Sequence, residues 1–177
     1  MSTSRTELTV NGLEISVYGL TEYKKLNEGS PAAVMFAMHG RTNNKTQMEA
    51  VSQVLCSLNG RKGGQQLQRH LLVVTFDHLN HGSRLVDKTR NLGWTKGKNN
   101  NPTNGIDQWS MMSAAAQTVS ALIDVLEYYL FGPHQQPVEV WGCLGFSMGA
   151  HASYITAANG MLFYIYVYIY IIYRFFY

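Results

Sequence analysis

Residues 138–149, VEVWGCLGFSMG, decide the fold that we expect for this chain. The run begins apolar without alternation, which is typical of a strand buried on both faces of a sheet. It continues into Gly145-x-Ser147-x-Gly149, and an alanine-rich helical stretch follows over 148–158. Glycines two residues either side of a serine permit a sharp strand-to-helix turn where neighbouring backbone leaves no room for side chains. The run therefore predicts a serine held at the end of a buried strand.

Two similar apolar runs lie upstream, AAVMFAM at 32–38 and LLVVTF at 71–76. Alternating residues around Asn11-Gly12 predict a hairpin over 7–18. Apolar residues at helical spacing follow the first run, and Thr46 is the expected N-cap of that helix. The same spacing is strongest over 108–131, where a second helix is expected. The order predicts an α/β fold: a mostly parallel sheet with an N-terminal antiparallel hairpin and helices on both faces.

The expected core combines strand residues with one face of the long helix. In the strands we expect burial of Val34, Phe36, Val73, Val74, Val140 and Leu144. On the helix, Trp109, Val119 and Leu126 are expected to pack against the sheet. The segment 78–107 has no clear period and is expected to be a long irregular loop.

Composition limits the functional classes. A chain of 177 residues with 46% hydrophobic content has room for one domain with a real core. Cys56 and Cys143 are isolated, which favours buried thiols in a reducing compartment over a disulfide framework. A net charge of +3 is too mild to indicate nucleic-acid binding, and we expect no metal or cofactor. The polar N-terminus lacks the apolar region of a secretory signal, so a cytoplasmic location is expected.

Three features occur in one order along the chain. His39-Gly40 follows the run at 32–38, Phe76-Asp77 with His81-Gly82-Ser83 follows the run at 71–76, and the Ser147 turn follows the third run. In this order they resemble the N-terminal part of an α/β-hydrolase, of the serine esterase, dienelactone-hydrolase and prolyl-oligopeptidase-like branch. The resemblance covers roughly residues 5–158, and we assign 1–160 to a C-terminally truncated hydrolase domain.

The resemblance implies a chemistry for this turn. Ser147 would be the nucleophile that attacks a small-molecule ester or a related acyl bond. The backbone N–H groups of Met148 and Arg41 would form an oxyanion hole for the tetrahedral intermediate. Gly145 and Gly149 would support the turn that holds Ser147, known in this family as the nucleophile elbow. His39 and Gly40 would support the neighbouring loop.

The sequence departs from the resemblance at the catalytic acid and base. Hydrolases of this fold place Asp or Glu and then His after the serine, but no acidic residue follows Ser147 and His151 is the only later histidine. His151 is expected to project away from the attack face. Asp77 and His81 remain as an improvised acid and base, although a loop-shaping role for His81 is favoured. The chain is therefore expected to be inactive or weak, and a catalytically dead binding protein is the alternative.

The tail, MLFYIYVYIYIIYRFFY at 161–177, changes composition abruptly. It fits a strand, because aromatic and β-branched residues alternate. It also fits a membrane anchor, although its 13 uncharged residues fall short of the ~20 that a spanning helix needs. The interpretation we favour is translated noncoding sequence, since an AT-rich intron or a frameshift explains both the Tyr-Ile repeat and the missing acid and base. The tail is accordingly expected not to be native to the fold.

Overall fold

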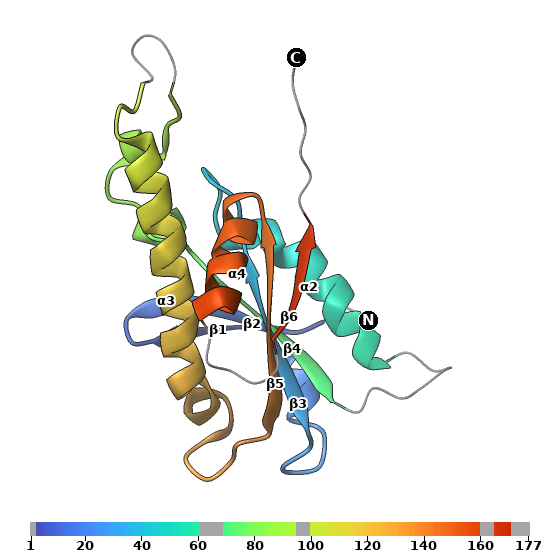
Figure 1. The fold of residues 1–177 in the computed structure, drawn as a ribbon. Coiled ribbons are helices and arrows are strands. Elements are labelled where there is room, and N and C mark those ends of the chain that lie inside the picture. Colours follow the sequence, from blue (N-terminus) through green and yellow to red (C-terminus); the bar gives the residue numbers. More distant parts are fainter. Residues whose placement is uncertain (1–2, 61–68, 95–99, 160–164, 171–177) are drawn as a thin grey trace.

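A six-stranded sheet forms the centre of the protein (Figure 1). The computed structural model describes residues 3–60, 69–94, 100–159 and 165–170. The sheet has the order β1-β2-β4-β3-β5-β6. β1 pairs antiparallel with β2 and β2 antiparallel with β4, whereas β3, β4, β5 and β6 run parallel. The strands are β1 Arg5–Val10, β2 Leu13–Tyr18, β3 Ala32–Met38, β4 His70–Phe76, β5 Val138–Phe146 and β6 Ile165–Tyr170.

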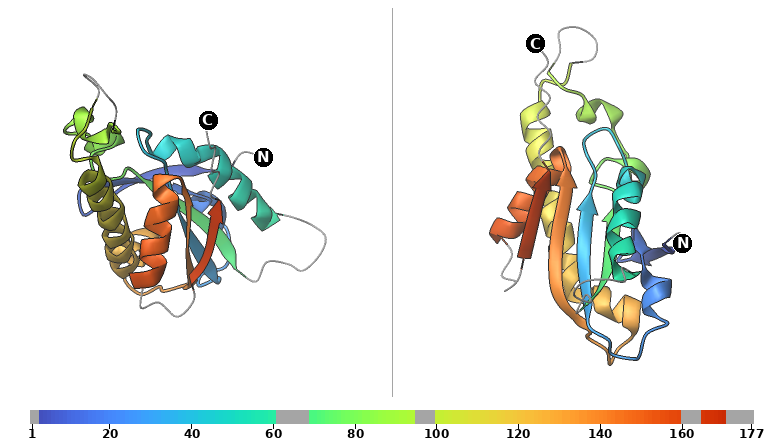
Figure 2. Two further views of the ribbon diagram at one scale, coloured as in Figure 1. Left: turned by 45° about the horizontal axis from the view of Figure 1, so that its top comes forward. Right: turned by 90° about the vertical axis from the view of Figure 1, so that its right-hand side faces the viewer.

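Helices cover both faces of this sheet (Figures 1 and 2). α3 and α4 lie together on one face, and α2 lies on the other. The helices are α1 Leu20–Tyr23, α2 Glu49–Cys56, α3 Asn104–Phe131 and α4 Met148–Asn159. Short 3-10 helices are η1 Lys45–Met48, η2 Ser57–Gly60, η3 Gly82–Arg84 and η4 Lys88–Asn91. This arrangement confirms the predicted fold class.

The core has two parts, one on each side of β3 and β4. Val34, Phe36 and Val74 face α3, where Val119 and Leu126 are fully buried against them. Val73 packs on the opposite face beneath α2. Six of the predicted core positions are therefore confirmed.

Three predicted core residues are less buried than expected. Val140 and Leu144 are only half-buried, because α2 lies over β4 and β2 and leaves this face of β5 partly open. Trp109 was expected to pack on the sheet but is 56% exposed. The buried stripe of α3 passes through Met111 and Ala115, and two residues correspond to about 200° around a helix. Trp109 therefore points away from the sheet.

Loop segments differ from prediction in detail. The helical segment after β3 starts as η1, and its cap is Asn44, whose side chain accepts from the N–H of Thr46, so Thr46 is not the N-cap. α3 begins at Asn104, within the segment expected to be irregular. The buried amides of Asn91 and Asn104 donate to backbone carbonyls of Asn80 and Leu92. These side-chain hydrogen bonds fix the backbone of a segment in which hydrophobic periodicity predicts no regular structure.

Part of the tail is described, as β6. It runs parallel to β5 with a continuous register from Trp141 opposite Ile165 to Phe146 opposite Tyr170. The strand interpretation of 165–170 agrees with this pairing, whereas 161–164 and 171–177 lie outside the described residues. Among the helices that the structure describes, none has the length and hydrophobicity needed to cross a membrane.

Candidate active site

Ser147 occupies the sharp turn between β5 and α4. Its φ is +53°, a left-handed conformation that is uncommon for residues other than glycine and is concentrated at functional sites. A Cβ on Gly145 would lie 2.1 Å from the carbonyl carbon of Gly149, and a Cβ on Gly149 would lie 2.2 Å from the carbonyl oxygen of Met38. Neither position can hold a side chain. Ser147 is exposed, and its hydroxyl makes no hydrogen bond within the described residues.

The loop after β3 passes beside this turn. Met38 is in register with Gly145 on the adjacent strand, so both strands end at the same edge of the sheet. A Cβ on Gly40 would lie 2.9 Å from the ring of Phe146, the residue that precedes Ser147. Arg41 follows, and its guanidinium donates to the Asn91 carbonyl at 3.4 Å. The placement of the Arg41 and Met148 amides around the oxyanion stays a prediction.

His39 joins the loops after β3 and β4. The ring is fully buried, with Nδ1 donating to the Gly40 carbonyl at 2.7 Å and Nε2 accepting from the His78 N–H at 3.1 Å. In return His78 Nε2 donates to the His39 carbonyl at 2.9 Å. Burial lowers the pKa of His39 to about 4 and that of His78 to about 3, so both rings are neutral at pH 7. This contact fits a loop-fixing role for His39.

Asp77 anchors the same two loops. Its Oδ1 accepts from the Lys45 N–H at 2.7 Å, and its Oδ2 accepts from the N–H and hydroxyl of Ser83 at 2.8 and 2.9 Å. Burial alone would raise the pKa of the carboxyl, but these hydrogen bonds hold the pKa below its ordinary value. A Cβ on Gly82, whose φ is +50°, would lie 2.2 Å from this carboxylate. The Asp77 carboxyl is therefore ionised, and both of its oxygens already accept hydrogen bonds.

His81 and His151, the other two histidines considered in the sequence analysis, also form hydrogen bonds with the backbone. His81 is buried, with Nδ1 donating to the Leu79 carbonyl at 3.0 Å and Nε2 accepting from the Thr42 N–H at 3.0 Å. No hydrogen bond joins it to Asp77 or Ser147 in the part of the chain that the structure describes. His151 is exposed, and its Nδ1 donates to the backbone carbonyl of Ser147 at 3.0 Å. Neither ring forms a hydrogen bond with the Ser147 hydroxyl among the described residues.

Sequence reasoning missed His78, which is fully buried and whose ring centre lies 4.3 Å from that of His39, with the two rings tilted by 59°. The available signal was its position, because His78 follows β4 closely, as His39 follows β3. The three histidines are not arranged as a metal centre: among the described residues, no group of three possible ligands has suitable geometry.

The sheet order and the parallel crossovers are consistent with a partial α/β-hydrolase fold. Solved structures agree at this level. TT1662 from Thermus thermophilus aligns over 90% of this chain and 53% of its own, with 19% identity and a TM-score of 0.51. A thermostable carboxyl esterase from Bacillus coagulans, solved with glycerol, aligns over 96% and 44%, with 14% identity and a TM-score of 0.51.

The chain spans about half the length of these two structures. At such identities the likeness shows the fold alone. No protein-family profile matches the sequence, and a comparison with curated proteins finds no match.

Proposed function

We propose that this chain carries the nucleophile of a serine hydrolase acting on carboxylic esters or related acyl bonds. The observation that carries the proposal is the strained turn at Ser147, with φ +53°, between two glycines that cannot hold a Cβ. Such strain costs about 1–3 kcal/mol and persists where surrounding structure imposes it. The turn presents an exposed hydroxyl at the start of α4.

In the proposed reaction Ser147 Oγ attacks the acyl carbon, and the carbonyl oxygen becomes an oxyanion. The N–H groups of Met148 and Arg41 would donate to it, and the positive end of the α4 dipole would favour the same charge. Amides that are already oriented stabilise this charge without reorganisation when it develops. The branch named by the sequence resemblance supports an ester or acyl substrate.

The Ser147 proton lacks an acceptor among the described residues. His81 uses both ring nitrogens, and His151 donates to the serine's own carbonyl. In this proposal the acid and base of the complete enzyme come from the later part of the hydrolase fold, beyond the half that this chain matches. The chain alone should therefore be a poor esterase, because a protonated hydroxyl is a weak nucleophile at neutral pH.

The test compares p-nitrophenyl ester hydrolysis by the chain, by Ser147→Ala and by Ser120→Ala, a serine exposed on α3. We expect a low rate in all three proteins, because the catalysis that remains without a base comes from the oxyanion hole and binding and does not need the serine. Triad knockouts of other enzymes keep ~10³–10⁴-fold catalysis over water, which sets the upper range. A fluorophosphonate that labels Ser147 no faster than the exposed Ser120 in the folded chain would sink the proposal. Ordinary enzyme rates abolished by Ser147→Ala would instead reveal an internal base, with His81 and Asp77 the first pair to mutate.

A catalytically dead binding protein is the second candidate, because every histidine near the turn is already engaged. Labelling with a fluorophosphonate separates the two candidates. Covalent modification at Ser147 would favour the hydrolase, whereas an unlabelled but folded chain would favour the binding protein.

A further inference from the structure

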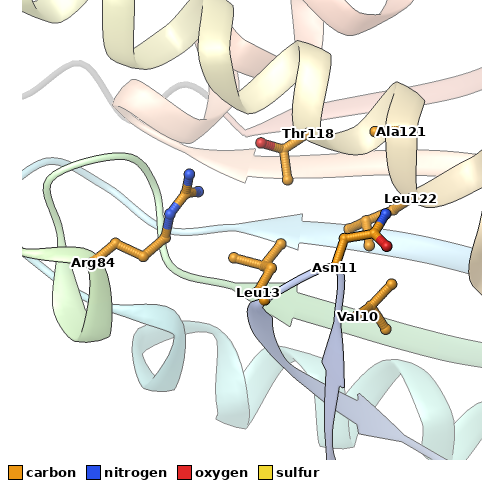
Figure 3. Close-up of a pocket in the computed structure, with 8 residues that line it drawn as sticks. Val10, Asn11, Leu13, Arg84, Thr118, Ala121 and Leu122 are labelled. Atoms are coloured by element: carbon orange, nitrogen blue, oxygen red, sulfur yellow. The ribbon is translucent and has the colours of Figure 1, made fainter.

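A pocket of about 230 Å³ opens between the β1–β2 hairpin and the middle of α3 (Figure 3). None of its residues belongs to the serine turn. The hairpin tip contributes Asn11 and Gly12, whose φ values of +51° and +77° are those of a tight two-residue hairpin turn. The lining residues are Val10, Asn11, Gly12, Leu13, Arg84, Thr118, Ala121 and Leu122.

Arg84 provides the pocket's charge. Figure 3 shows its guanidinium extending from the end of η3 toward α3. One nitrogen, Nη1, donates to the backbone carbonyl of Asp77 at 3.1 Å. Arg84 is half-buried, and it forms no ion pair with any described carboxylate. Three other described arginines form ion pairs: Arg5 with Glu7, Arg69 with Glu139 and Arg90 with Asp87. A guanidinium in this state has free donors for an anion.

Four of the other seven lining residues have aliphatic side chains. Leu13 lies between Arg84 and Asn11 in Figure 3, and the lining residues Val10 and Leu122 belong to the hydrophobic core. A single cation beside aliphatic walls suits a ligand with one negative charge and an alkyl part. The volume lies below the ~300–1,000 Å³ typical of pockets for drug-sized ligands, so the ligand should be small.

We propose that this pocket binds a short-chain aliphatic monocarboxylate. The carboxylate pairs with the planar guanidinium of Arg84, which matches carboxylate geometry in a two-bond arrangement. The alkyl chain lies against Leu13 and Ala121, which are half-buried and exposed, respectively, and removes their apolar surface from water. Inorganic phosphate fits less well, since it would find one cation and no apolar complement.

Sodium hexanoate is the probe, titrated into the ¹⁵N-labelled full chain and followed by amide chemical shifts. We expect a Kd on the order of 1 mM, in line with the size of the ligand, with shifts concentrated at Gly12, Leu13 and Leu122. Arg84→Gln should weaken binding about tenfold or more. Arg90→Gln removes the same charge from an exposed arginine outside the pocket and should leave the affinity unchanged. Hexanamide, the neutral analogue, should bind as weakly as hexanoate does to Arg84→Gln.

A second variant covers the case in which Arg84→Gln does not fold. Ala121 is exposed on α3, so Ala121→Phe should be tolerated while its ring fills the pocket and abolishes binding. Equal binding of hexanoate and hexanamide, or shifts located elsewhere on the chain, would overturn the proposal. The site is independent of the proposed hydrolase: Ser147→Ala should bind hexanoate as the parent chain does, so one proposal can fail without the other.

Discussion

Gly149→Ala tests the backbone contact on which the serine turn depends. The added Cβ would lie 2.2 and 2.6 Å from the carbonyl oxygen and carbon of Met38, and 2.7 Å from the His39 oxygen. All three atoms are backbone atoms of β3 or the loop that leaves it, so no flexible side chain can move aside. Overpacking of this kind costs 1–3 kcal/mol or more, and we place this case at the upper end, about 3 kcal/mol. For a domain of this size the melting temperature should fall by about 6–12 °C.

Urea unfolding followed by circular dichroism measures this loss directly. Gly93→Ala is the matched control, because its Cβ would meet only the end of the Arg41 side chain at 3.4 Å and its φ is not positive. That control should change the free energy of unfolding by less than about 0.5 kcal/mol. If Gly149→Ala is as stable as Gly93→Ala, then α4 does not press against β3 as described, and the argument for the turn at Ser147 fails with it.

Three further outcomes follow from burial and hydrogen bonding. Burial lowers the pKa of His39 and His78 to about 4 and 3 in the folded state, so the unfolded chain binds more protons below pH 6.5. Stability measured by urea titration should thus fall between pH 6.5 and 4, and a flat profile would contradict the buried neutral rings. Asp77→Ala should cost about 3 kcal/mol, since three donors lose their acceptor, and an unchanged melting curve would refute this anchor. Leu126→Ala should cost about 2–5 kcal/mol because Leu126 is fully buried. Trp109→Ala should change stability far less, and equal losses for both would show that Trp109 is packed after all.

Much of the fold could be predicted because it depends on local patterns. The apolar runs at 32–38 and 71–76 read as buried strands, and Asn11-Gly12 as a hairpin turn, because each pattern reflects neighbours along the chain. Trp109 shows the limit of this reasoning. Helical spacing is satisfied by more than one stripe on a 28-residue helix, and only the packing against the sheet selects the stripe through Met111.

The candidate site divides in the same way. The sequence by itself determined where Ser147 lies and why Gly145 and Gly149 flank it, because a strand-to-helix turn is a local arrangement of backbone. Only the tertiary structure decided what the histidines do. His81 meets the Thr42 amide, and His39 meets the His78 amide, each across 39 residues of sequence. Such partners are set by the order of strands in the sheet, which brings the ends of β3 and β4 together. The same order places Arg84 opposite α3, and no spacing along the chain could have shown that pocket.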